Sequence, residues 1–289
     1  MKALIVAGML VAVGPVAALQ RPAPQATFRR RVDVVQLDVS VVRRGQPVRG
    51  LTAADFVVTD NGEPQVVDSV VLDQLPLNVE LVLDTSGSVV GGRLKHLIAA
   101  ADGLLTALRP GEQAGLLTFS DLLRVSAPPT ADLAQVRRTL AAIAGKGGTA
   151  LRDAVQLSLV THHDEGARPL LLVFTDGVDN VSWLSDEEVM ESVRRSGVVI
   201  HVVRVAAREL SPTRFVERLV QTAGGRLWSA RSEEDLERLF TSVLDEMRAR
   251  YLLSFSPREP LRPGWHKLGM RLRNVRGEIT ARPGYFVTP

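Results

Sequence analysis

Three short segments of the sequence place oxygen-bearing side chains where their types and spacing could bind a metal ion. The first, Asp84-Thr85-Ser86-Gly87-Ser88, follows a mostly apolar run of strand length, and the third, Thr175-Asp176-Gly177, follows another. Between them, Gly147-Gly148-Thr149-Ala150 puts a hydroxyl at the start of an expected helix. The candidate ligands contain no sulfur and no imidazole, which suits Mg²⁺, Mn²⁺ or Ca²⁺ better than Zn²⁺. These candidates are Asp84, Ser86, Ser88, Thr149 and Asp176.

The charge of this ligand set suggests what the ion could do. Two carboxylates only balance a divalent charge, so the ion would stay electrophilic at an open coordination position, where a partner's Asp or Glu carboxylate could bind. Taken singly, each segment is explained as well by helix capping or a turn, and the metal hypothesis depends on all three occurring together. Nearby Asp153, Asp179 and Asn180 are assigned to caps and turns. His162-His163 is assigned to a solvated helix end, and Trp183 either to an exposed rim contact or to packing.

The elements that must position these segments follow from the hydrophobic pattern of residues 77–250. Strand-length apolar runs alternate there with stretches of helical period, as in a doubly wound, mostly parallel α/β sheet of the Rossmann-like type. Because ligands bind beyond the carboxyl ends of such strands, we expect the three segments at one edge of the sheet. The expected strands are 79–83, 113–119, 122–126 as an edge hairpin partner, 170–174, 198–205 and 226–229. The expected helices are 93–108, 131–143, 150–161, 185–195 with a capping box of Ser185 and Glu188, 213–223 and 232–250.

The sequences on either side of this region are typical of β-structure. Residues 28–75 show period-two alternation, one short helical turn, and an Asn61-Gly62 turn that predicts a hairpin between 56–59 and 65–72. Residues 251–289 contain further short apolar runs separated by Pro and Gly. Neither flank has enough strands for stability alone. We therefore predict one small β-sandwich, built from 28–75 and 251–289, into which the α/β domain is inserted.

In their order and wide separation, the D-x-S-x-S, G-G-T and T-D-G motifs resemble the von Willebrand factor type A domain with its metal-ion-dependent adhesion site. The resemblance covers about residues 77–250. It implies hydroxyl ligands from the two serines and the threonine, and two aspartates that bind the ion directly or through water. All five positions match the motif, and they are Ser86, Ser88, Thr149, Asp84 and Asp176.

The flanks and the N-terminus indicate export. An L-T-x-x-D-F segment at 51–56 and an R-x-G-Y segment at 282–285 resemble a bacterial subfamily of exported von Willebrand factor A-related proteins. Residues 1–18 have the basic start, short apolar run and small residues of a secretory signal peptide, and 19–27 would be a leader. An uncleaved membrane anchor is the alternative, although the apolar run is short for a span. We expect a periplasmic, cell-envelope or secreted protein.

Composition and missing motifs narrow the classes of function. The chain has 289 residues, no cysteine and a net charge of +3, with arginines and carboxylates interspersed. Nucleic-acid binding is therefore disfavoured, and disulfides and thiolate metal sites are excluded. Ser86 stands where a phosphotransferase of the haloacid dehalogenase type has its second aspartate. Gly147 stands where a P-loop has Ser or Thr, and no G-x-S-x-G motif occurs.

The sequence thus predicts an exported, non-enzymatic protein-binding module. A divalent cation, Mg²⁺ in the first place and Mn²⁺ or Ca²⁺ otherwise, would coordinate an acidic residue of a partner protein. Two alternatives stay open here. One is a metal-assisted hydrolase, although no general base stands out beside the five ligands, and the other is a scaffold component whose metal only stabilises the fold.

Overall fold

The central sheet of the α/β part is built from almost wholly apolar strands, because both faces of a parallel sheet are covered by helices. The computed structural model describes residues 34–72, 75–161, 166–175, 178–205, 214–257 and 262–288, all within one compact unit. The strands of this sheet are β6 (Leu77–Asp84), β7 (Gln113–Phe119), β8 (Leu123–Thr130), β9 (Arg168–Phe174), β10 (Val199–Val205) and β11 (Leu227–Ala230). Their order is β11-β10-β9-β6-β7-β8, and all pairs are parallel except β7 with β8. The predicted doubly wound, mostly parallel sheet is therefore confirmed.

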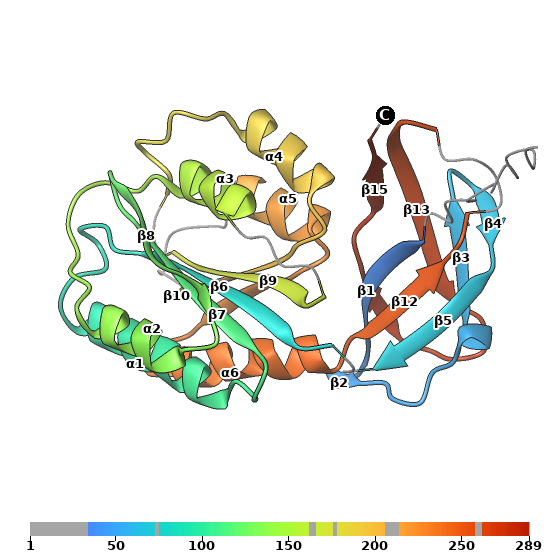
Figure 1. Ribbon diagram of the computed structural model, residues 1–289, viewed down its shortest axis with the longest axis horizontal. Coiled ribbons are helices and arrows are strands. Elements are labelled where there is room, and N and C mark those ends of the chain that lie inside the picture. The colour runs from blue at the N-terminus through green and yellow to red at the C-terminus, as the bar shows by residue number, and fades with distance from the viewer. Residues whose placement is uncertain are drawn as a thin grey trace, which may run out of the picture. The chain divides into compact units, whose positions relative to one another are not determined.

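Helices cover both faces of this sheet (Figure 1). One face packs against α1 (Gly92–Ala107), α2 (Leu133–Ala141) and α6 (Asp235–Arg248). The other packs against α3 (Leu151–Thr161), α4 (Asp186–Arg195) and α5 (Arg214–Thr222). The predicted capping box is present at α4, where the Ser185 backbone N–H donates to the Glu188 carboxylate over 2.9 Å. The amphipathic pattern of each segment thus becomes a buried helix face on one side of the sheet.

The connections out of β6 create the crevice at the sheet's carboxyl edge. From β6 the chain passes through α1 on one face and continues into the neighbouring strand β7. On the other side β6 pairs with β9, and the chain leaves β9 towards α4 on the opposite face. Adjacent strands whose connections leave in opposite directions form the switch point where ligands bind in such sheets. Two of the three candidate segments follow these two strands.

The two flanks of the sequence combine into two antiparallel sheets, as predicted. The first sheet has the order β14-β1-β12-β5, with β2 paired to β1, and the second has the order β15-β13-β3-β4. Residues of both flanks enclose a shared core that includes Leu37, Phe56, Tyr251 and Phe255. The elements are β1 (Val35–Arg43), β2 (Gln46–Pro47), the 3₁₀ turn η1 (Ala53–Asp55), β3 (Phe56–Asp60), β4 (Glu63–Gln65), β5 (Val67–Leu72), β12 (Tyr251–Phe255), β13 (Gly264–Leu272), β14 (Glu278–Thr280) and β15 (Gly284–Val287).

The predicted hairpin in the first flank is only half right. Asn61 and Gly62, with φ of 49° and 93°, do turn β3 into β4. The prediction that residues 65–72 continue this hairpin is wrong, because β5 pairs with β12 in the other sheet. The turn is a local property of two residues, whereas the partner of β5 is supplied by a strand about 180 residues further along the chain. The first flank therefore contributes β1, β2 and β5 to one sheet of the sandwich and β3 and β4 to the other.

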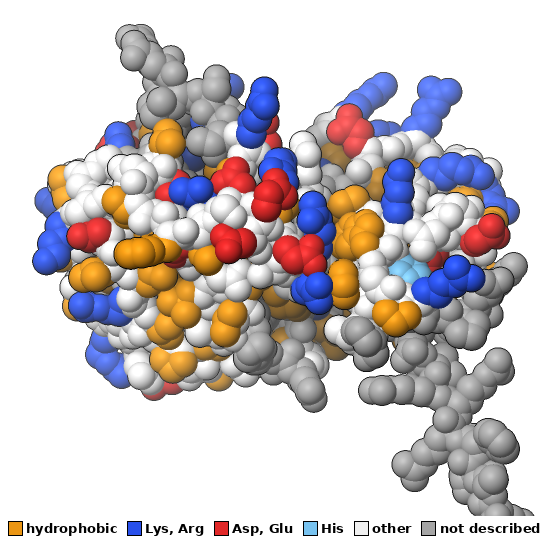
Figure 2. All heavy atoms as spheres, turned by 90° about the horizontal axis from the view of Figure 1, so that it is seen from above, with side chains coloured by type: hydrophobic (Ala, Val, Ile, Leu, Met, Phe, Trp, Pro, Cys, Tyr) orange, Lys and Arg blue, Asp and Glu red, His pale blue; other side chains and the backbone are white. Residues whose placement is uncertain are grey.

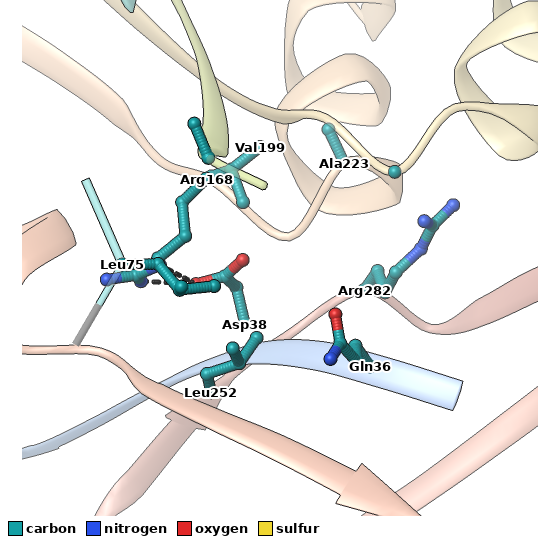
Figure 3. A pocket seen from close by; sticks show the side chains of 10 residues that line it. Gln36, Asp38, Leu75, Arg168, Val199, Ala223, Leu252 and Arg282 are labelled. Carbon is teal, nitrogen blue, oxygen red and sulfur yellow. Dashed lines mark hydrogen bonds and ion pairs between the residues drawn. The ribbon is translucent and has the colours of Figure 1, made fainter. Parts of the chain in front are cut away.

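An ion pair joins the sandwich to the α/β part. Arg168, the first residue of β9, extends towards Asp38 of β1 (Figure 3). Its Nε lies 2.8 Å from Asp38 Oδ1, and its Nη2 contacts the same oxygen. Arg168 is only 3% exposed. The pair lines a small pocket of about 180 Å³ together with residues such as Gln36 and Arg282.

The surface of the described residues carries charges of both signs. On the face shown in Figure 2, Lys and Arg side chains lie among Asp and Glu side chains, with hydrophobic side chains exposed between them. Among the described residues, no helix is both long and apolar enough to cross a membrane.

Candidate metal site

Asp84 is the most deeply placed of the predicted ligands. It is the last residue of β6 and is 0% exposed. Its Oδ1 accepts a hydrogen bond of 2.9 Å from the backbone N–H of Ser86, and its Oδ2 accepts one of 2.7 Å from the hydroxyl of Thr175. Because Thr175 directly follows β9, this contact links the carboxyl ends of the two central strands. The carboxylate is thereby oriented in the crevice between them.

Ser86 and Ser88 lie in the turn that follows Asp84. Their hydroxyl oxygens are 3.1 Å apart. Ser86 is buried at 1% exposure, whereas Ser88 is exposed. Two hydroxyls at this separation, next to a buried carboxylate, form a cluster of hard oxygen donors in which each oxygen can face one cation.

Backbone hydrogen bonds bring the second candidate segment to this turn. The N–H of Gly87 donates to the carbonyl oxygen of Gly147 over 2.9 Å, and the N–H of Lys146 donates to that of Thr85 over 2.7 Å. Gly145 lies so close to the turn that an added Cβ would be 3.1 Å from the Thr85 carbonyl oxygen. The glycines of this loop therefore permit a backbone approach that a larger residue would obstruct.

Thr149 is held in place by Asn180, a residue that sequence analysis assigned to a turn. The side-chain oxygen of Asn180 accepts a hydrogen bond of 2.9 Å from the Thr149 N–H, and the Asn180 N–H donates to the Thr149 carbonyl oxygen over 3.0 Å. Thr149 is 4% exposed. Within the described residues its hydroxyl donates and accepts no hydrogen bond, which suits an oxygen reserved for a ligand.

The four described candidates fit a divalent cation. They supply a buried carboxylate and three hydroxyls from two loops that are hydrogen-bonded to each other, and oxygen donors of this kind are those that hard cations prefer. The fifth candidate, Asp176, lies outside the described residues, as does the His162-His163 pair. The assignment of all five as ligands stays a prediction.

Asp179 accepts the Ser182 N–H in a turn, as the sequence suggested, whereas Asp153 binds backbone about 30 residues further along the chain. The carboxylate of Asp153 accepts the N–H groups of Trp183 and Leu184 over 2.9 and 3.0 Å. Asp179 accepts the N–H and guanidinium of Arg152. Burial acts to raise the pKa of Asp179, but these hydrogen bonds outweigh it and lower the pKa. Both carboxylates shape the loop that carries Trp183. The Trp183 side chain is 95% exposed, so of the two possibilities left by the sequence it is an exposed residue and not a packed one.

The two flank motifs have structural roles. In the first, the Thr52 N–H and hydroxyl both donate to the Asp55 carboxylate over 2.9 Å, which closes η1. In the second, the Arg282 guanidinium donates to the carbonyl oxygen of Arg194 in α4 over 2.9 Å. Both motifs are therefore accounted for by contacts that stabilise the fold.

A buried triad in the sandwich was not anticipated from the sequence. The Tyr285 hydroxyl donates to Asp60 Oδ2 over 2.7 Å, and His266 Nδ1 lies 2.9 Å from Asp60 Oδ1. Burial, helped by Asp60, raises the pKa of Tyr285 well above its ordinary value, so its hydroxyl is a poor nucleophile. The triad joins β3, β13 and β15 and stabilises the sandwich.

A second buried cluster, also missed, connects α6 to the sheet. Its members are His201 of β10, Trp228 of β11, Glu246 of α6 and Arg250. His201 Nδ1 accepts the Trp228 indole N–H over 2.9 Å, so its proton lies on Nε2, which is 3.2 Å from Glu246 Oε2. Glu246 also receives the Arg250 Nε over 2.9 Å. We call this group the α6 cluster.

Comparison with known proteins agrees with this geometry. Residues 79–178 match the family model described as the von Willebrand factor type A domain. The chain is 28% identical over 138 residues to the bovine inter-alpha-trypsin inhibitor heavy chain H4, and 28% identical over 141 residues to the magnesium-chelatase 60 kDa subunit of Rhodobacter capsulatus. These matches cover 43% and 44% of this chain but only 15% and 25% of the relatives, so the chain spans a small part of their length.

Among solved structures, the fold is similar to proximal thread matrix protein 1 from the mussel byssus, described with a zinc-occupied MIDAS motif. The TM-score is 0.53 at 18% identity, over 67% of this chain and 50% of the mussel chain. At this identity the likeness concerns the fold alone. The family match identifies residues 79–178 as part of a von Willebrand factor type A domain, and the order of the central sheet agrees with that fold.

Proposed function

We propose that this chain is an exported, metal-dependent protein-binding module. A divalent cation is held by Asp84, Ser86, Ser88, Thr149 and Asp176 and binds a carboxylate of a partner protein. The observation that supports this most strongly is that Asp84, Ser86 and Ser88 lie together at the switch point of the sheet, in a turn that backbone hydrogen bonds join to the loop carrying Thr149.

The chemistry of the site favours recognition. A bound divalent ion supplies a Lewis-acidic position that an acidic side chain can occupy, because the two aspartates only balance its charge and the hydroxyl ligands add none. The zinc-occupied motif of the mussel protein supports a divalent ion in this fold, and we propose Mg²⁺ here. Support for export is the pattern of residues 1–18, which lie outside the described residues.

A metal-assisted hydrolase is the second candidate, and similarity to a magnesium-chelatase subunit keeps an enzyme-related role in view. Against it, two carboxylates in the described loops, Asp153 and Asp179, are engaged with backbone N–H groups and with Arg152. A third candidate is a scaffold whose ion only stabilises the fold. Turnover of generic phosphoesters would favour the hydrolase, and metal binding without any metal-dependent partner would favour the scaffold.

Thermal unfolding with and without metal tests the site. We expect Mg²⁺ or Mn²⁺ to raise the melting temperature of the wild type, because a ligand that binds only the folded state stabilises it, by about 2.7 kcal/mol at a hundredfold excess over Kd. Asp84→Ala should abolish the metal-dependent shift. A wild type without a shift, or an equal shift in the variant, would disprove the site. A pull-down from envelope extract in Mg²⁺ and in chelator, with Asp84→Ala as control, then separates partner binding from a scaffold role.

Gly148→Ala should weaken metal binding without removing any ligand. A Cβ at this position would lie 2.8 Å from Val181 Cγ1 and 2.9 Å from Asn180 Oδ1, the atom that holds Thr149. Disturbing such a supporting contact lowers metal affinity by about 10- to 100-fold. Isothermal titration calorimetry with Mn²⁺ measures the metal affinity of wild type and variant. Gly103→Ala in α1 is the matched control, since nothing lies within 4 Å of its added Cβ, and equal affinities of the two variants would contradict the expectation.

A further inference from the structure

A cavity of about 410 Å³ opens directly beside the metal loops. It lies between the β7–β8 hairpin and the end of α2, and its lining includes Thr85 and Lys146. Thr85 stands between two of the proposed ligands, and Lys146 belongs to the loop that carries Thr149. The Lys146 N–H to Thr85 carbonyl bond of 2.7 Å forms part of the shared wall. A molecule bound to the ion therefore has this cavity as its neighbour.

The walls of the cavity are held in place by local hydrogen bonds. The Thr85 hydroxyl donates to the Phe119 carbonyl oxygen over 3.0 Å, which fastens the metal turn to the end of β7. Across the hairpin, the hydroxyls of Thr118 and Ser126 are 3.0 Å apart. The cavity is thus a built feature of the hairpin and the metal turn.

The chemistry of the lining combines positive charge with apolar surface. Arg124 and Lys146 are both exposed, and neither forms an ion pair with any described residue. Leu122 and Val125 are 65% and 41% exposed, although such side chains are usually covered in a soluble protein. Ile143 contributes a partly buried side chain at the end of α2. Cations beside uncovered aliphatic side chains complement an acidic segment that also carries a large apolar residue.

We propose that this cavity binds the part of the partner protein that adjoins the metal-bound carboxylate, and that this part contains a second acidic residue and a large apolar side chain. The inference rests on the proposed function and specifies its partner. An extended peptide advances about 3.3 Å per residue, so a segment anchored at the ion enters the cavity within a few residues. The second carboxylate pairs with Lys146 or Arg124, and the apolar side chain covers Leu122, Val125 and Ile143.

The test is selection from a displayed peptide library with one fixed Asp and random flanks, against the full chain in Mg²⁺ and in chelator. We expect enrichment in Mg²⁺ of peptides that carry Asp or Glu and Leu, Ile or Phe near the fixed Asp. In the double variant Arg124→Glu/Lys146→Glu, binding of these peptides should weaken about tenfold or more, because juxtaposed like charges are costly. Its metal-dependent melting shift should remain. Arg271→Glu, an exposed position in β13, is the matched control.

Methyl NMR of isoleucine-labelled protein locates the bound peptide. The Ile143 resonance should shift on addition of a selected peptide, whereas Ile279 in β14 should not. Leu122→Ser should weaken binding of the selected peptides that carry a large apolar residue. The preference for a second Asp or Glu should be unchanged in this variant.

The outcomes separate the two proposals. Three results would overturn the cavity proposal and leave the proposed function standing. They are selection of Mg²⁺-dependent peptides that show no preference for flanking residues, a flanking preference that is unchanged in the double variant, and an Ile143 resonance that does not shift. If no peptide depends on Mg²⁺ and no metal shifts the melting temperature, the proposed function fails, and the cavity proposal fails with it.

Discussion

Glu246→Ala should lower the free energy of unfolding by about 3–5 kcal/mol, the cost of breaking a buried ion pair by removing one partner. Arg250 is 0% exposed, and its Nε lies 3.0 and 2.9 Å from the two carboxylate oxygens of Glu246. Its Nη1 donates to the Gly224 carbonyl oxygen over 2.7 Å. Without the carboxylate, the Arg250 guanidinium would stay buried in the α6 cluster beside His201, and among the described residues its remaining hydrogen bond would be the one to the Gly224 carbonyl oxygen.

The α6 cluster also makes the stability difference between wild type and Glu246→Ala depend on pH. Burial acts to raise the pKa of Glu246, but the charge of Arg250 and the contact with His201 outweigh it, and the pKa lies well below its ordinary value of 4.5. A depressed carboxyl pKa contributes stability above pH 4.5 that is lost as the pH falls below it. Burial also lowers the pKa of His201, so the wild type loses some stability already as the pH falls through about 6.5. The difference in unfolding free energy between wild type and Glu246→Ala should therefore narrow below pH 4.5.

Urea unfolding of the full chain at several pH values measures both effects. Glu237→Ala is the matched control, because Glu237 lies on the exposed side of the same helix. A loss in Glu246→Ala no larger than that in the control would show that the α6 cluster does not stabilise the fold. A gap that stays constant from pH 7 to pH 3 would contradict the lowered pKa.

Asp38→Ala should be destabilising to a similar extent, by about 3–5 kcal/mol, because it leaves the Arg168 guanidinium buried and unpaired. Arg168 is 3% exposed and already has one guanidinium nitrogen, Nη1, without a hydrogen bond among the described residues. The contact joins β1 to β9, so its loss acts on the junction between the sandwich and the α/β part (Figure 3).

A double-mutant cycle checks this pair. Arg168→Met in the Asp38→Ala background should restore much of the stability, because an apolar side chain needs no partner in that environment. Asp68→Ala in β5 serves as the exposed control. If the double variant were as unstable as Asp38→Ala, or if Asp38→Ala matched the control, the ion pair would not be the cause.

Features that depend on neighbours in the chain were predictable from the sequence. The capping box at Ser185, the Asn61-Gly62 turn and the apolar strands that end at Asp84 and Phe174 all appear as expected, because backbone conformation and strand period are encoded within a few residues. The order and chemistry of the three loops likewise indicate the family from the sequence alone.

Features that depend on distant partners were decided only by the tertiary structure. The pairing of β5 with β12, the Arg168–Asp38 ion pair and the α6 cluster each join residues far apart in the chain, and no local pattern records which partner a buried charge will meet. The same holds at the site, where Asn180 holds Thr149 and the exposed Leu122 borders the metal turn. The sequence by itself determined which donors are available. Packing of the sheet and its loops decided that the four described donors share the carboxyl edge of β6 and β9, because only the folded chain brings their backbones within hydrogen-bonding reach.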